Sequence, residues 1–238
     1  MKQAPIPDND RERVEALEDY DLLMATPEAW FDHIVNLASN LCSTPIALVS
    51  LVGRDQQFFK ASEGLPPDLT CGSRANSFCG HAILEPGIFE VPDTHEDDRF
   101  RTNPWVTDDP AVRFYAGARL LNDAGFALGT VCVLDHQPRR LTDAQKEALQ
   151  SLASVVMQHI ETRRSESFGR HLRRIIDTSD HFVAVLDAVD FRVLHANERL
   201  QQLAGNTGGA PDLRNLAIGD VFPPLDPAFL GELASQDP

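Results

Sequence analysis

The chain has 238 residues and a formal net charge of −15 at pH 7. An acidic chain repels a phosphate backbone or an anionic membrane surface, and no Lys/Arg cluster offsets this. We therefore expect neither nucleic acid nor a membrane as a partner. Hydrophobic residues make up 42%, enough for a full core. No window approaches the roughly 18 apolar residues of a bilayer span, and the polar N-terminus lacks the apolar segment of a signal peptide. These features predict a cytoplasmic protein whose four cysteines are reduced thiols.

The first 25 residues form a polar, acidic segment, and the first strong structural signal follows it. Thr26 and Pro27 predict a helix start, with a side-chain cap followed by proline at the first helical position. Apolar residues then recur at helical spacing and predict one buried face: Trp30, Phe31, Ile34, Leu37, Ala38 and Leu41. Residues 46–53 and 56–65 predict the two strands of a hairpin across a polar turn.

The middle of the chain alternates short apolar runs with polar segments. Residues 66–77 are typical of a loop, and residues 78–83 (FCGHAI) form a short β-type apolar run. Residues 88–93 predict a short strand. The polar excursion over residues 94–109 has room for one helical turn.

The clearest hairpin joins residues 114–121 to residues 126–135 through an Asn-Asp-Ala-Gly turn. Thr142 and Gln145 fit a capping box, which predicts that a long helix begins there. The apolar stripe of this helix is interrupted by a polar segment and comprises Leu149, Leu152, Val156 and Ile160, then Phe168, Leu172, Ile175 and Ile176. Such an interruption indicates a helix that leaves one domain and enters the next.

A second, smaller pattern follows the long helix. Residues 182–188 and 191–197 predict two strands around a tight turn, and residues 198–205 predict a short helix ending on Gly205. The remaining residues are rich in turn formers and supply too few strands to cover the hairpin. We expect only part of this second unit to be present in the chain.

Nine blocks in succession resemble a bacterial GAF domain: DNDRERVEAL, TPEAWFDHIVNLAS, PIALVSLV, QQFFKASEGL, SFCGHAI, VPDTHEDDRFRTNPWV, RFYAGARL, LGTVCVLD and PRRLTDAQKEALQSLA. Three later blocks, IIDTSDHFVAVLDA, VLHAN and IGDVF, resemble the first part of a PAS domain. The resemblance implies an α+β fold, in which a GAF-type antiparallel sheet carries helices on one face and a pocket on the other. It divides the chain into an N-terminal segment (1–25), a GAF domain (26–160), a connecting signalling helix (161–177) and a partial PAS-type α+β unit (178–238).

The resemblance also implies a function. Such regions are sensory input modules of bacterial signal-transduction proteins, normally upstream of a histidine kinase or a diguanylate cyclase. We therefore expect an unidentified small-molecule ligand in the GAF pocket and an output domain outside this chain. The apolar residues of the long helix beyond Ile160 predict a parallel homodimer, because a partner helix is the simplest cover for them. The alternative is a ligand-free structural GAF module that only dimerises.

The most suggestive short constellation is Cys79-Gly80-His81, because a thiol and an imidazole suit a metal or a nucleophile pair. A zinc site needs four ligands, and Cys71 and His95 are the only additions available. We expect no metal here, with Cys79 packed as a small buried thiol and His81 donating a hydrogen bond to a loop carbonyl.

Three further GAF-type chemistries lack their residues. Free methionine sulfoxide reductase, a minor alternative, needs a third cysteine beside Cys71 and Cys79, and the loop after residues 88–93 has none. The motif around a bilin-binding cysteine and the cyclic-nucleotide signature are also missing. We therefore assign no catalytic residue and no cofactor, which favours a protein that binds over an enzyme.

The candidate ligand-pocket residues are Phe78, Cys79, His81, Asp93, Trp105, Phe114, Tyr115 and Arg119. Structural roles compete for several of them. Asp93 follows a proline and is typical of a turn cap. Trp105, Phe114 and Tyr115 suit either a pocket wall or a core.

Overall fold

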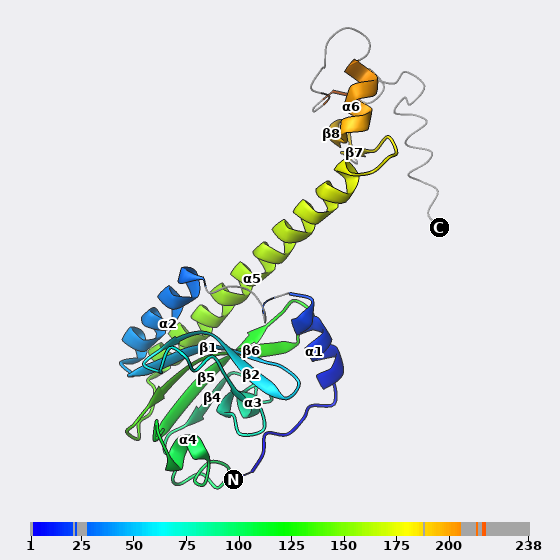
Figure 1. The fold of residues 1–238 in the computed structure, drawn as a ribbon. Coiled ribbons are helices and arrows are strands. Elements are labelled where there is room, and N and C mark those ends of the chain that lie inside the picture. The colour runs from blue at the N-terminus through cyan, green and yellow to red at the C-terminus, as the bar shows by residue number, and fades with distance from the viewer. Residues whose placement is uncertain are drawn as a thin grey trace. The chain divides into compact units, whose positions relative to one another are not determined.

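The computed structural model describes residues 2–20, 22, 28–187, 189–205, 213, 216 and 217 (Figure 1). The chain divides into two compact units, Met1–Arg164 and Ser165–Pro238. The helix start predicted at Thr26 and Pro27 lies outside the described residues. The helix itself, α2, spans Ala29–Cys42.

The first unit is built on a six-stranded antiparallel sheet with the order β3-β2-β1-β6-β5-β4 (Figure 1). Its strands are β1 (Ile46–Val52), β2 (Gln56–Glu63), β3 (Cys71–Ser73), β4 (Ile88–Val91), β5 (Phe114–Leu121) and β6 (Ala127–Asp135). The two most apolar strands, β1 and β6, lie at the centre, and every residue in them is buried. The predicted antiparallel α+β fold is confirmed.

Helices α1 (Asp10–Glu18), α2 and the first part of α5 (Asp143–Asp177) supply an apolar layer for one face of the sheet. Alternate residues of β1, among them Val49 and Leu51, point into this layer. The predicted stripe of α5 is buried in it: Leu149, Leu152, Val156 and Ile160. The predicted capping box also forms, with Thr142 N donating to Gln145 Oε1 at 3.0 Å and Gln145 N to Thr142 Oγ1 at 3.3 Å.

The other face carries two short helices, α3 (Phe78–Ala82) and α4 (Pro104–Thr107), with the loops around them (Figure 1). Two expectations were wrong here. The predicted loop 66–77 contains β3, which pairs with β2 through three residue pairs. The predicted β-type run at 78–83 is instead the helix α3, capped by Ser77, whose Oγ accepts a hydrogen bond from Gly80 N at 2.8 Å. Elements of three to five residues are too short to show a period of two or 3.6.

The N-terminal residues belong to this unit. Lys2 N donates to Arg99 O and Ala4 N to Ala75 O, so residues 2–4 lie against the loops on the α3 side. The space that Ala4 occupies depends on Gly80, because a Cβ at Gly80 would lie 2.8 Å from the Ala4 methyl. We call residues 2–7 the N-terminal strap.

Helix α1 is attached by a buried charge cluster. The Asp10 carboxylate accepts hydrogen bonds from Arg13 and, through two bonds of 2.7 and 2.8 Å, from Arg74. Both guanidiniums also donate to Gly53 O at the β1–β2 turn. A single carboxylate therefore connects α1, this turn and the segment that precedes α3.

The second unit has a small core of its own. β7 (Ala184–Leu186) pairs antiparallel with β8 (Val193–Ala196), and α6 (Glu198–Gly205) follows. These elements confirm the predicted hairpin and short helix. Asn197 is fully buried, and its side chain bonds the Val183 amide and the His181 carbonyl, which ties the hairpin to the preceding loop.

Candidate functional site

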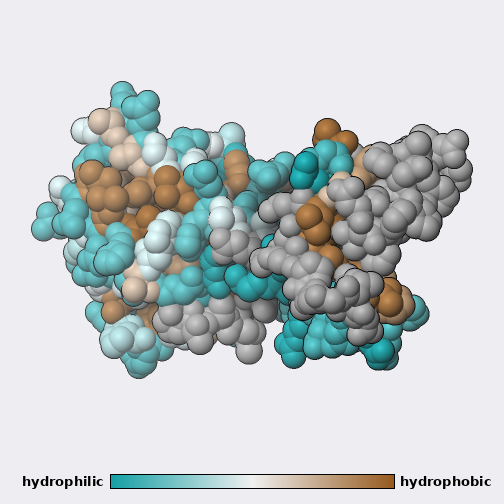
Figure 2. Space-filling view, turned by 90° about the horizontal axis from the view of Figure 1, so that it is seen from above, coloured by the Kyte–Doolittle hydropathy of each residue, from teal (hydrophilic) through white to brown (hydrophobic). Residues whose placement is uncertain are grey.

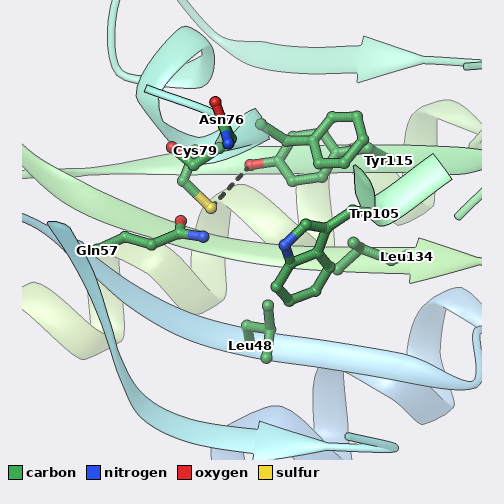
Figure 3. Close-up of a pocket in the computed structure, with 9 residues that line it drawn as sticks. Leu48, Gln57, Asn76, Cys79, Trp105, Tyr115 and Leu134 are labelled. Atoms are coloured by element: carbon green, nitrogen blue, oxygen red, sulfur yellow. Dashed lines mark hydrogen bonds between the residues drawn. The ribbon is translucent and has the colours of Figure 1, made fainter. Parts of the chain in front are cut away.

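A small cavity lies between the sheet and helices α3 and α4 (Figure 3). It is lined by Leu48, Gln57, Asn76, Ser77, Phe78, Cys79, Trp105, Tyr115 and Leu134. Its volume is about 10 Å³, room for about one water molecule. The sheet supplies its floor from four strands, and the excursion between β3 and β5 supplies its roof.

Three aromatic rings, Phe78, Trp105 and Tyr115, form part of the wall. Phe78 stacks on Tyr115 with ring centroids 5.1 Å apart, and Trp105 meets Phe59 edge-on at 5.9 Å. The Tyr115 phenol lies along β5 over Gly117, where a Cβ would come within 2.4 Å of its hydroxyl oxygen. The glycine therefore leaves the space through which the Tyr115 hydroxyl reaches the cavity.

Beneath the aromatic wall the sheet carries buried polar groups. Ser50 and Thr130 are paired across β1 and β6, and Ser50 Oγ donates to Gln57 Oε1 at 3.4 Å. Thr130 Oγ1 is buried and has no partner at hydrogen-bonding geometry among the described residues, but it lies close enough to Cys79, Cys132 and Tyr115 to lower their pKa values. Packing alone does not require such groups, since a buried hydroxyl without a partner costs free energy. We call Ser50, Gln57 and Thr130 the polar floor.

Two thiols complete this region. Cys79 Sγ lies 3.9 Å from Cys132 Sγ, and the Tyr115 hydroxyl donates to Cys79 Sγ at 3.6 Å (Figure 3). The hydrogen bond from Cys132 lowers the pKa of Cys79, and that from Tyr115 adds to the effect. Burial raises the pKa of Cys132 well above its ordinary value. Cys79 is therefore the better nucleophile of the pair.

The other two cysteines are separate from this site. Cys42 is buried at the end of α2, where desolvation raises its pKa to about 11. Cys71 is exposed on β3. All four thiols are free in the structure.

Four of the predicted pocket residues, Phe78, Cys79, Trp105 and Tyr115, line the cavity together. Phe114 does not, because successive residues of a strand point to opposite faces. It is fully buried in the core beneath the helices. Arg119 lies two strand periods beyond Tyr115 on β5, is half-buried and is not part of the lining.

The remaining two candidates have structural partners. Asp93 accepts from His95 N at 3.0 Å, the predicted turn cap, and pairs with Arg113 at 2.6 Å. His81 Nε2 lies 3.3 Å from the Lys2 carbonyl of the N-terminal strap. This contact agrees with the predicted bond to a carbonyl, and burial lowers the pKa of His81.

The sequence reasoning missed five lining residues, Leu48, Gln57, Asn76, Ser77 and Leu134, and it missed the polar floor. A signal was present, because Ser50 and Thr130 interrupt strands that are otherwise apolar. A polar residue at the centre of a fully buried strand indicates a polar neighbour or a bound molecule. The sequence does not tell whether such a residue contacts a polar side chain or a bound molecule, because that depends on which strands lie beside it.

Cys79 and His81 do not converge on one point, since the thiol contacts Cys132 and the imidazole contacts Lys2. Across the described residues, no group of three or more His, Cys, Asp and Glu side chains is placed to hold a metal ion.

This arrangement defines a small α+β domain, with a sheet between a helical layer and a roofed cavity. The sequence profile of the GAF domain matches residues 26–160, more than half of the chain. The chain therefore belongs to the GAF domain family.

A protein named cyclic di-GMP phosphodiesterase from Pseudomonas aeruginosa is 39% identical over 169 residues, which are 71% of this chain and 28% of that protein. The chain thus spans less than a third of the length of this relative.

Several solved GAF domains share the fold. That of a phosphoenolpyruvate-protein phosphotransferase from Coxiella burnetii aligns with a TM-score of 0.52 and 10% identity, over 66% of this chain and 95% of its own. The GAF domain of the Acinetobacter phosphoenolpyruvate-protein phosphotransferase aligns with a TM-score of 0.50 and 14% identity, over 67% of this chain and 96% of its own. A domain of a two-component sensor histidine kinase from Sinorhizobium meliloti aligns with a TM-score of 0.50 and 15% identity, over 60% of this chain and 97% of its own. At these identities the likeness concerns the fold alone.

Among the described residues, no helix combines the length and the apolar character needed to cross a bilayer.

Proposed function

We propose that the chain is the sensory input region of a bacterial signalling protein and that its GAF domain binds a small molecule in the roofed cavity. The name of the Pseudomonas aeruginosa relative favours an output that hydrolyses cyclic di-GMP, where the sequence favoured a histidine kinase or a diguanylate cyclase. The partial PAS unit predicted for residues 178–238 then lies between sensor and output, although most of its residues beyond Gly205 lie outside the described part of the chain.

The observation that carries ligand binding is the polar floor beneath an aromatic wall. Among the lining residues, Gln57 and Asn76 offer hydrogen bonds, and Tyr115, Phe78 and Trp105 offer stacking surfaces. A few polar groups in a largely aromatic cavity are typical of small-molecule sites. At about 10 Å³ the cavity is too small for a metabolite, so a metabolite enters only when the roof moves. Among the helices that form the roof, α4 is the shorter, with four residues. Its side chain Trp105 is therefore the part of the roof that we expect to move.

Thermal-shift measurements test this proposal, because a ligand that binds only the folded chain raises the melting temperature. The probes are cyclic mononucleotides, cyclic di-GMP and the free amino acids. Gln57→Leu should abolish the rise produced by an active probe. Gln56→Leu is the matched control, since Gln56 is exposed on the same strand, and should keep it. Equal responses of both variants would place binding elsewhere.

The small cavity also favours a second candidate, a structural module that acts by dimerising. Figure 2, which looks onto the side of the helices, shows apolar atoms gathered on this domain. Leu37 and Leu41, which the sequence placed on the buried face of α2, are instead 45% and 44% exposed, and Val155 of α5 is 46% exposed. We propose that a second copy covers these residues. Val155→Glu should then shift a dimer to monomer in analytical ultracentrifugation, whereas Ser154→Glu, the same charge at an exposed neighbour, should not.

Signal transfer follows from the continuity of α5, whose residues Leu172 and Ile175 are 45% and 61% exposed. In a parent protein with its output domain, seven residues inserted at Ser165 keep the helical phase within about 20°. An insertion of two residues at the same place turns the downstream part of the helix by about 200° relative to the upstream part. The seven-residue insertion should preserve regulated output activity, and the two-residue insertion should leave the output permanently on or off. Equal tolerance of both would exclude transmission through the helix.

A further inference from the structure

The buried thiol pair of Cys79 and Cys132 is not needed for ligand binding by the polar floor. The two sulfur atoms are 3.9 Å apart, within reach of the roughly 2.05 Å of a disulfide after a shift of about 2 Å. Cys132 is on β6 at the centre of the sheet, whereas Cys79 is on the five-residue helix α3. The shift therefore falls on α3, the smaller of the two elements.

The cavity gives a route to one of the two sulfurs. Cys79 lines it and Cys132 lies behind Cys79. A volume of about 10 Å³ suits a water-sized molecule. Hydrogen peroxide is little larger than water, so a cavity of this size can admit it.

We propose that Cys79 and Cys132 are an oxidant-sensing dithiol, which hydrogen peroxide converts to a disulfide. The sulfur of Cys79 attacks one peroxide oxygen, the O–O bond breaks, and hydroxide leaves as water with the thiol proton. Cys132 sulfur then attacks Cys79 sulfur, the S–S bond forms, and the S–O bond breaks to release a second water. Two thiols and one peroxide become one disulfide and two waters, with both sulfurs oxidised and both oxygens reduced.

The surroundings favour this order of events. The Tyr115 hydroxyl donates to Cys79 Sγ, which stabilises its thiolate, the form that attacks peroxide. Cys132, whose pKa is raised, remains a thiol and acts second as the resolving partner.

Contacts of α3 can transmit its displacement to α1 and to the N-terminal strap. Its cap, Ser77, bonds the Arg74 carbonyl at 2.8 Å, and Arg74 bonds Asp10 of α1. His81 contacts the N-terminal strap, and Gly80 is packed against Ala4. Farther along, the Tyr20 hydroxyl donates to Glu161 on α5. Disulfide formation should therefore loosen the strap and α1, and its use as a signal rests on the proposed sensory function.

Peptide mapping of the full chain tests the chemistry. In a Cys71→Ser background, which removes the exposed thiol, equimolar hydrogen peroxide should abolish two titratable thiols per chain and produce a Cys79–Cys132 peptide. Cys132→Ala should lose that peptide. Cys42→Ala, which removes a buried thiol elsewhere, should keep it. The wild-type chain, mapped in the same way, should give the same Cys79–Cys132 peptide, so the test survives a variant that fails to fold.

Amide hydrogen exchange tests the consequence. Oxidation should increase exchange over residues 2–18 in the wild type and leave it unchanged in Cys132→Ala. Sulfinic acid on Cys79 without a disulfide, or a linkage through another cysteine, would overturn the proposal. Disulfide formation without a change in exchange would overturn its transmission. Neither result affects the thermal-shift test with metabolites, so the two proposals fail separately.

Discussion

The two faces of the central sheet contrast in what they bury. The face beneath α1, α2 and α5 is packed with apolar side chains from every strand it involves. The face beneath α3 and α4 also has an apolar core, but interrupts it with the polar floor, the Tyr115 hydroxyl and two thiols. Neighbours on one strand, such as Phe114 and Tyr115, serve opposite faces.

This difference separates stability from function. An apolar face with long helices gains free energy from every group it buries. Buried hydroxyl, amide and thiol groups give no such gain unless they are paired. The cavity face therefore carries the reactive and polar groups of the domain. The free energy gained by apolar burial on the helical face offsets the free energy lost by burying them.

The largest effect is expected on the helical face. Phe114→Ala removes a fully buried ring, which should lower the free energy of unfolding by about 3–5 kcal/mol. Urea denaturation followed by circular dichroism measures it. A loss below about 1 kcal/mol would mean that this face is not the main source of stability.

A smaller loss is expected at the charge cluster. Asp10→Asn weakens the bonds to two buried guanidiniums and should cost about 2 kcal/mol at pH 7. Burial raises the pKa of Asp10, but hydrogen bonds from Arg74 and Arg13 lower it below its ordinary value overall.

The sign of the pH dependence follows from that depressed pKa. The stabilisation is present above the unfolded-state pKa of about 3.9 and is lost as the pH falls through the folded value. The difference in stability between wild type and Asp10→Asn should therefore shrink below about pH 4. A difference that stays constant from pH 7 to pH 3 would show that the Asp10 charge is not involved.

On the cavity face, a substitution should stabilise. Thr130→Val replaces a buried hydroxyl that lacks a partner among the described residues, and should raise the free energy of unfolding by about 1 kcal/mol. Ser50→Ala is the control, because its hydroxyl is bonded to Gln57, and should lower it. Destabilisation by Thr130→Val would indicate that its hydroxyl stabilises the neighbouring Cys79, Cys132 and Tyr115 side chains.

The smallest effect on stability is expected at Tyr115→Phe. The ring and its stacking on Phe78 remain, and only the hydroxyl contact to Cys79 is lost, at about 0.5 kcal/mol. Removing this donor should raise the pKa of Cys79 and slow its oxidation by peroxide, which stopped-flow thiol titration measures. An unchanged oxidation rate would show that Tyr115 does not activate the thiol.

The sequence by itself determined the elements whose pattern repeats over many residues. The hairpins 46–63 and 114–135, the buried stripe of α5 and its capping box are local consequences of periodicity, turn residues and helix caps. The order of the blocks also indicated the GAF family, which the profile match at residues 26–160 confirms.

Only the tertiary structure decided which side chains share the cavity. Cys79 and Cys132 are 53 positions apart, and Gln57 and Thr130 come from different hairpins, so no local pattern pairs them. Short elements such as β3 and α3 were equally hidden, because three to five residues fit several conformations until neighbours supply bonds. Side-chain alternation then assigned Phe114 to the core and Tyr115 to the cavity, a choice that depends on which face of the sheet the helices cover.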